Sequence, residues 1–262
     1  MRKLVVNADD FGFTRDVNAG IVEAHRRGIL TATTLMAPGN AFDDAVRLAR
    51  ENPRLDVGCH LVLVGSPGFP DTIPALVRAV AAGRIPIYEE LAGQVRRILD
   101  AGIQPTHLDA HKHTHLLPPV LDAVARISQE FGIPWIRRPF DFPLDANRVG
   151  LAKRLISGAF GVMRSRFQRV LTAHQCRMTD HFAGFRITGN YDAVELVRLI
   201  GRLPEGSTEF MCHPGFCGDE LRAARTRLKE SREQELRALT APEVRQALSD
   251  AGVELTGYRG LA

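Results

Sequence analysis

The stretch MRKLVVNADDFGFTRDVNAGIVEAHRRGILTATTLMA, residues 1–37, predicts a strand, a helix and a second strand in succession. The apolar, β-branched run at 4–8 predicts the first strand. A helix is predicted over 17–27, because apolar side chains recur there at helical spacing and Gly28 stands at the stop position. The run LTATTLMA at 30–37 predicts the next strand. Such a unit is the building block of a parallel sheet covered by helices.

The same alternation continues along the rest of the sequence. Further strands are predicted at 56–63, 105–111, 133–138, 181–185, 207–213 and 253–258, and helices at 41–51, 89–101, 118–131, 149–171, 192–203 and before Leu239. Seven or eight units predict a single α/β domain over 1–262 with a TIM-like (β/α) barrel, complete, distorted or seven-stranded. In such a barrel the functional side chains gather at the C-terminal ends of the strands. The turn-rich loop 64–75, VGSPGFPDTIPA, is expected to lie over this end.

Composition indicates an ordinary globular protein. The 262 residues are 45% hydrophobic and 24% charged, which suffices for a full core without disulfides. The four cysteines form no CxxC pair, the N-terminal stretch lacks a signal-peptide core, and no run of about 18 apolar residues occurs. We therefore expect reduced thiols and a cytoplasmic protein. The net charge of +4 favours anionic surfaces, but with 6% aromatic residues and no recognition motif we expect no nucleic-acid partner.

Polar side chains follow two of the predicted strands. Asp9 and Asp10 come directly after the apolar strand, and burial of two adjacent carboxylates is costly without a cation or another partner. Their position indicates a metal ligand and a base; the alternative is that one of them caps the following turn. His60 closes the strand VGCHL, where a lone histidine is weak evidence for a ligand.

The run HLDAHKHTH, residues 107–115, carries histidine or aspartate at every second position. If the segment stays extended, this period of two directs His107, Asp109, His111, His113 and His115 to one side. The carboxylate of Asp109 could accept a hydrogen bond from a neighbouring histidine and so orient its ring. The alternative is a solvated, histidine-rich loop. One aspartate and two histidines from three strand ends would leave positions open for water and substrate on Zn, Mn, Co or a similar divalent ion.

Two further histidines are candidates for the site. His213 in EFMCHPGF stands before a Pro-Gly turn and is expected at the strand-end rim, either as a functional group or as a turn residue bonded to backbone. Asp180 and His181 in TDHFAG are similar candidates.

Four motifs together resemble the YdjC-like carbohydrate deacetylase family: NADDFG at 7–12, GCHLVL at 58–63, THLDAHKHTH at 106–115 and MCHPG at 211–215. The resemblance implies one divalent metal ion, Mg or Zn first and Mn or Co as alternatives, held by Asp10, His60 and His111. It also implies that Asp9 is the base. Ala110 replaces a serine often seen in the family and Lys112 replaces a histidine, but neither change removes a proposed ligand.

The implied reaction is the hydrolysis of an N-acetyl group. The metal lowers the pKa of a water, Asp9 accepts its proton, and the acetamide carbonyl is attacked. His213 is the first candidate for protonating the departing amine, and protonated Asp9 is the second. The products are acetate and a free amino sugar.

The segment 146–179 contains seven basic residues and no acidic residue. Its apolar residues have largely helical spacing, which fits either a helix on an anionic bilayer or a barrel helix with solvated arginines. The sequence is also similar to the branch of the family associated with hopanoid biosynthesis, whose expected substrate is an N-acetylglucosaminyl lipid. A lipid-linked substrate would fit peripheral contact with the inner face of the membrane.

Other functions fit the same residues. A metal-dependent phosphoesterase would use the same ligands, with Arg137 and Arg138 binding phosphate. A noncatalytic carbohydrate-binding or metal-binding barrel would need ligands but no base. The oligomeric state is left open, with a homodimer as one alternative.

Overall fold

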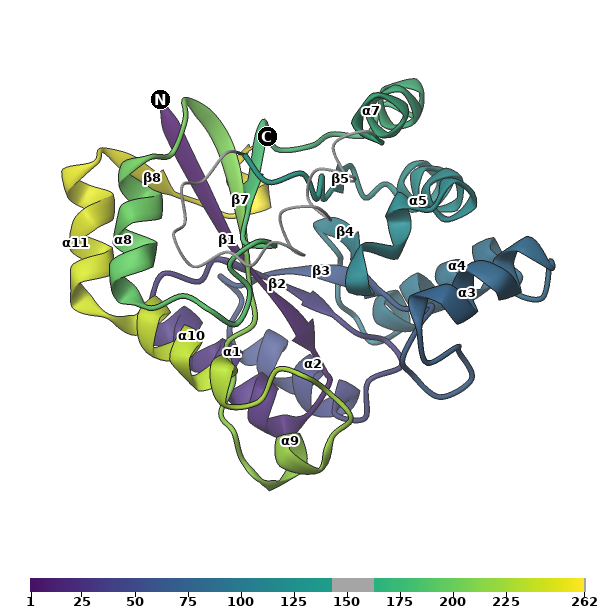
Figure 1. Cartoon of the computed structure of the whole chain (residues 1–262), viewed down its shortest axis with the longest axis horizontal. Helices are drawn as coiled ribbons and strands as arrows, with labels where there is room; N and C mark the ends of the chain where they lie inside the picture. Colours follow the sequence, from purple (N-terminus) through teal and green to yellow (C-terminus); the bar gives the residue numbers. More distant parts are fainter. Residues whose placement is uncertain (143–162, 262) are drawn as a thin grey trace.

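The computed structural model describes residues 1–142 and 163–261 and shows a curled parallel sheet with helices around its outside (Figure 1). The strands are β1 (Arg2–Phe11), β2 (Ala32–Leu35), β3 (Asp56–Leu61), β4 (His107–Ala110), β5 (Trp135–Ile136), β6 (His181–Ala183), β7 (Gly206–Cys212) and β8 (Val253–Leu255). Their order along the sheet is β5-β4-β3-β2-β1-β7-β6, and β8 pairs with the first residues of β1. The α/β class is therefore confirmed.

The two edges of this sheet are linked across the gap between β5 and β6. Trp135 forms an isolated parallel bridge with Arg177, and Asp141 forms one with Phe182 of β6. The Phe142 N–H donates to the Phe182 carbonyl at 3.0 Å. Because these contacts replace a continuous ladder, the sheet closes irregularly. The prediction of a distorted TIM-like barrel is confirmed.

The helices follow the strands as the alternation predicts. They are α1 (Arg15–Arg27), α2 (Phe42–Glu51), α3 (Ile73–Ala81), α4 (Ile87–Asp100), α5 (Pro118–Phe131), α7 (Arg164–Ala173), α8 (Ala193–Gly201), α9 (Asp219–Ala223), α10 (Glu230–Thr240) and α11 (Pro242–Asp250), with 3₁₀ turns η1 (His111–Leu116) and η2 (Tyr258–Leu261). The helices α3, α9 and α11 were not predicted. The loop prediction over 64–75 was too long, because Thr72 caps α3 and ends the loop there.

Local sequence explains why the first helix begins where it does. The Thr14 hydroxyl accepts a hydrogen bond from the Val17 N–H at 3.2 Å, which satisfies one of the free donors at the start of α1. Val17, Ile21 and Ala24 then face the core, and none of them is exposed to solvent. The helix thus starts two residues before the predicted Val17.

One continuous hydrophobic core contains side chains from strands between β1 and β8 and from the helices packed around the sheet. The single-domain organisation over 1–262 stays a prediction. Within the basic segment, Phe167 and Leu171 of α7 are buried while Arg164, Arg166 and Arg169 are exposed. The described part of the segment therefore follows the barrel-helix interpretation, and residues 143–162 lie outside the described residues.

In the described ranges, no helix is both long and apolar enough to cross a membrane.

The approach of α1 to the loop after β7 gives a first prediction. A Cβ added at Gly20 would lie 2.4 Å from the Cα of Gly215, which is backbone and cannot rotate away. We expect Gly20→Ala to lower the free energy of unfolding by about 1–3 kcal/mol, because the helix must move outward. Urea unfolding monitored by circular dichroism measures the change.

Gly93 in α4 is the matched control, since a Cβ there meets nothing within 4 Å. Gly93→Ala should stabilise the protein by up to about 1 kcal/mol, because alanine is the better helix former. Equal effects of the two substitutions would contradict the close packing at Gly20.

Candidate metal centre at the strand ends

A bulge at the end of β1 places two adjacent carboxylates in one cavity. The register between β1 and β2 shifts between Ala8 and Phe11, and Asp10 has a left-handed backbone with φ 70°. Consecutive strand residues normally point to opposite faces, and a bulge removes this restriction. Asp9 and Asp10 consequently both line the same cavity, with 4% and 5% of their surfaces exposed.

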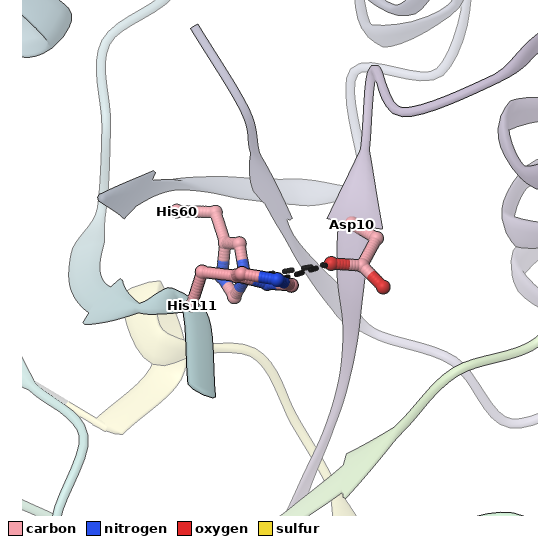
Figure 2. A group of neighbouring side chains, drawn as sticks. All are labelled: Asp10, His60 and His111. Carbon is pink, nitrogen blue, oxygen red and sulfur yellow. Dashed lines mark hydrogen bonds and ion pairs between the residues drawn. The ribbon is translucent and has the colours of Figure 1, made fainter. Parts of the chain in front are cut away.

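Asp10, His60 and His111 converge from the ends of β1, β3 and β4 (Figure 2). Asp10 Oδ1 lies 3.5 Å from His60 Nε2 and 3.4 Å from His111 Nδ1, and the two nitrogens lie 3.2 Å apart. Metal bonds of about 2.1 Å place neighbouring ligand atoms roughly 3.0–3.4 Å apart. The triangle of donor atoms therefore has a suitable size for one divalent ion. One carboxylate oxygen and two imidazole nitrogens are also a donor set that Zn and similar ions accept.

Asp109 fixes the ring of His60. Its Oδ1 lies 2.7 Å from His60 Nδ1, and its Oδ2 accepts a hydrogen bond from the Thr34 hydroxyl at 3.1 Å. Burial disfavours the imidazolium of His60, but the charge of Asp109 outweighs it and raises the pKa of His60 to about 9. Because Nδ1 faces Asp109, Nε2 is the nitrogen directed at Asp10 and available to a metal.

Arg137, just after β5, lies in the interior of the barrel and pairs with three carboxylates. Its Nη1 and Nη2 contact the two oxygens of Asp9 at 2.8 and 2.7 Å, and Nη1 also lies 2.6 Å from Asp109 Oδ2. Its Nε donates to Glu209 at 2.7 Å. The group Asp9, His60 and Asp109 also has closely spaced ligand atoms. Arg137 already neutralises Asp9 and Asp109, the two carboxylates of this second group. The triangle at Asp10 is therefore the better ion site.

These contacts argue against the alternative in which Arg137 and Arg138 bind the phosphate of a phosphoesterase substrate. Arg137 is fully buried and saturated by its three carboxylates, and Arg138 donates to the carbonyl of Asp180. Neither guanidinium lines the cavity beside Asp10.

His213 follows β7 and faces the same cavity. Its Nε2 lies 3.8 Å from Asp9 Oδ2, and its backbone N–H donates to Glu235 at 2.6 Å. Its ring Nδ1 has no hydrogen-bond partner among the described residues, so the alternative in which the ring bonds to backbone is not seen. Burial lowers the pKa of His213, against the opposing charges of Asp9 and Glu235.

The histidine-rich run does not stay extended, which corrects the expectation that its alternate residues share one side. The strand β4 ends at Ala110, and Lys112 and His113 adopt left-handed backbone with φ 53° and 54°. His111 alone of the three histidines after β4 joins the triangle. His113 packs edge-on against Phe182 and Phe185, and His115 Nε2 contacts the carbonyl of Arg137 at 3.1 Å.

Asp180 and His181 were expected at the strand-end rim, and this is wrong. His181 is the first residue of β6 and pairs with Thr208 early in β7, so both residues lie at the opposite end of the barrel. Asp180 Oδ2 accepts hydrogen bonds from the N–H and the hydroxyl of Ser207 at 2.8 Å. The strand was predicted at 181–185, so the error lay in assigning residues at its beginning to the rim formed by the strand ends.

Two charged residues of α10 reach the site and were missed by the sequence reasoning. Arg232 donates to Asp10 Oδ2 at 2.5 Å, and Glu235 holds the loop of His213. Both are 1% exposed. They lie in a strongly charged helix, where nothing in the sequence distinguishes a buried charge from a solvated one.

The cavity over these groups has a volume of about 940 Å³. Its walls include the loop 65–71, as expected, and the segments 38–40 and 224–228. Its lining includes both apolar and basic residues, namely Phe13, Met36, Phe69, Phe185, Leu228, Lys112, Arg225 and Arg227. The size suits a ligand larger than a single small molecule such as acetate.

The fold and the site together define a class: an α/β barrel protein with an Asp-His-His cluster at the C-terminal ends of its strands. Within that class, the chain belongs to the family of YdjC-like proteins, whose model matches residues 3–250. The family resemblance seen in the four motifs is confirmed.

Relatives extend over the whole chain. It is similar to a carbohydrate deacetylase from Brevibacillus brevis, with 34% identity over 99% of both chains. It is also similar to a chitooligosaccharide deacetylase from Klebsiella pneumoniae, with 34% identity over 98% of both. Among crystal structures, an Enterococcus faecalis protein, whose description suggests cellobiose-phosphate cleavage, matches with a TM-score of 0.76 and 26% identity, covering 100% of this chain and 99% of its own.

Glu209, on the far side of Arg137 from Asp9, gives a prediction about pH. Burial raises the pKa of Glu209 to about 7, although Arg137 opposes the shift. A raised carboxyl pKa contributes stability below about pH 4.5 that is lost as the pH rises to about 7. The unfolding free energy of the wild type minus that of Glu209→Gln should therefore fall by about 2–3 kcal/mol between pH 5 and pH 8.

Urea unfolding of both proteins at the two pH values measures this difference. Glu254→Gln, at an exposed position of β8, is the control and should change the unfolding free energy only slightly and by the same amount at both pH values. A difference between wild type and Glu209→Gln that does not vary with pH would contradict the prediction.

Proposed function

We propose that this protein is a metal-dependent carbohydrate N-deacetylase, acting on a sugar or glycolipid that contains N-acetylglucosamine. The observation that carries the proposal is the triangle of Asp10 Oδ1, His60 Nε2 and His111 Nδ1, with sides of 3.2 to 3.5 Å and Asp9 beside it. The names of the relatives, carbohydrate deacetylase and chitooligosaccharide deacetylase, support this reaction in particular.

In this proposal Asp10, His60 and His111 hold one divalent ion, Mg or Zn first and Mn or Co as alternatives. When bound, the ion would polarise the acetamide carbonyl and lower the pKa of a water. Asp9 lies beside the ligands and accepts the proton of the attacking water. Its two contacts to Arg137 leave lone pairs free, because an ionised carboxylate offers about four acceptor sites.

His213 completes the proton path. The lowered pKa of His213 keeps its ring neutral before the reaction, and its Nε2 lies 3.8 Å from Asp9 Oδ2. We propose that His213 takes the proton that Asp9 has accepted and delivers it to the amine nitrogen as the C–N bond breaks. The products are then a free amino sugar and acetic acid, which keeps the second proton of the water and releases it to solvent to give acetate.

The cavity supports a sugar as the substrate. Phe13, Phe69 and Phe185 line it, and aromatic rings suit the apolar faces of pyranose rings. A hopanoid glycolipid is the more specific proposal, and it rests on the resemblance in sequence. We further propose a cytoplasmic location, peripheral contact with the inner face of the membrane, and a homodimer. Because the described part of the basic segment buries Phe167 and Leu171, its exposed arginines would make the membrane contact.

Acetate release is the test of this function. Metal-reconstituted protein should release acetate from chitobiose or from an N-acetylglucosaminyl lipid, and chelation should abolish the release. His111→Ala removes a ligand, and Asp9→Asn removes the base while keeping the shape, so each should lower kcat by about 100-fold or more.

The same variants separate the alternatives. If the protein were a noncatalytic binding barrel, the wild type and Asp9→Asn would bind sugar with the same affinity, and neither would release acetate. Metal-dependent hydrolysis of a phosphate ester, without acetate release from either sugar, would replace the proposed function with a phosphoesterase.

A further inference from the structure

The two oxygens of Asp10 have different partners. Oδ1 faces the nitrogens of His60 and His111 at 3.5 and 3.4 Å. Oδ2 accepts a hydrogen bond from Arg232 Nη2 at 2.5 Å. A carboxylate can bind a metal through one oxygen or through both, and here one of the two is already engaged by a cation.

Arg232 is held in place by contacts of its own. It lies in the first turns of α10 with 1% of its surface exposed, and its Nε donates to the Leu228 carbonyl at 3.3 Å. Its main-chain carbonyl accepts from the Gly215 N–H at 3.3 Å, which ties it to the loop of His213. The Nη1 atom of Arg232 has no hydrogen-bond partner among the described residues. The carboxylate that pairs with Arg232 in the described part of the chain is that of Asp10, through Nη2.

A buried guanidinium is costly unless it is paired, so its presence beside Asp10 requires an explanation. Part of the explanation is that the two adjacent carboxylates each need a positive charge. Asp9 pairs with Arg137, and Asp10 pairs with Arg232. The geometries differ, however. Arg137 contacts both oxygens of Asp9, whereas Arg232 contacts only the oxygen of Asp10 that points away from the histidines.

We infer that Arg232 is a positioning residue for the metal: it holds Oδ2 of Asp10, so that Asp10 offers the single oxygen Oδ1 to the ion together with His60 and His111. This inference rests on the proposed metal site. Partners that orient a metal ligand typically change metal affinity or activity by about 10–100-fold when they are removed. The consequence is an ion with fewer protein oxygens and more positions left for water and substrate.

The test compares Arg232→Gln and Arg232→Lys with the wild type in the full-length protein. Affinity for Zn²⁺ and Co²⁺ is measured by competition with a chromophoric chelator, which needs no substrate. We expect Arg232→Gln to change the affinity for the ion by about 10–100-fold, and the affinity of Arg232→Lys, which keeps the charge but loses the planar fork, to lie between those of Arg232→Gln and the wild type. The visible spectrum of the Co²⁺ protein should also weaken in Arg232→Gln, because a freed carboxylate can coordinate through both oxygens.

Arg237 provides the matched control on the same helix. Its guanidinium is exposed and lies 3.8 Å from Glu233, so Arg237→Gln should leave metal affinity and spectrum unchanged. Thermal unfolding in chelator shows whether each variant is folded. Wild-type affinity and spectrum in a folded Arg232 variant would overturn the inference.

A metal-loaded crystal structure of the wild type decides the question even if neither variant folds. It should show Asp10 bound through Oδ1 alone and Arg232 on Oδ2, and binding through both oxygens or a displaced Arg232 would overturn the inference. The proposed function fails by a different result, namely a wild type that binds no divalent ion or releases no acetate.

Discussion

The pairing of the Arg137 guanidinium with three buried carboxylates is the interaction on which the rest of the interior depends. Asp9, Asp109 and Glu209 come from β1, β4 and β7, and Arg137 follows β5 at the edge of the sheet. Removing one partner of a buried ion pair typically costs about 3–5 kcal/mol, because the remaining charges are left unpaired. The curling of the sheet and the placement of Asp9 thus rely on the same contacts.

Asp9 and Asp10 are chemically identical neighbours that the structure makes different. Asp9 has both oxygens on Arg137 and lies beside His213, whereas Asp10 has one oxygen on Arg232 and the other directed at two histidines. The proposed roles of base and metal ligand follow from this difference in partners. Each negative charge has its own buried arginine, which is why two adjacent carboxylates can occupy one cavity.

Unfavourable backbone geometry contributes to the same site. Asp10, Lys112 and His113 all have positive φ, although none is glycine. Such conformations cost roughly 1–2 kcal/mol each for residues with a side chain. The first lies in the bulge of β1, and the other two follow His111 after β4 and turn His113 into the aromatic packing around Phe182.

The sequence by itself determined the alternation of strands and helices and the residues at the strand ends. The prediction of a helix at 118–131 matches α5, and Asp10, His60 and His111 meet because parallel strands end at one edge. Only the tertiary structure decided the charge partners. Arg137 meets Asp9 across 128 residues and Arg232 meets Asp10 across 222, and a charged residue in a helix looks the same in sequence whether water or a buried carboxylate is its partner. Short-range patterns fix local geometry, whereas these pairings exist only once the barrel has closed.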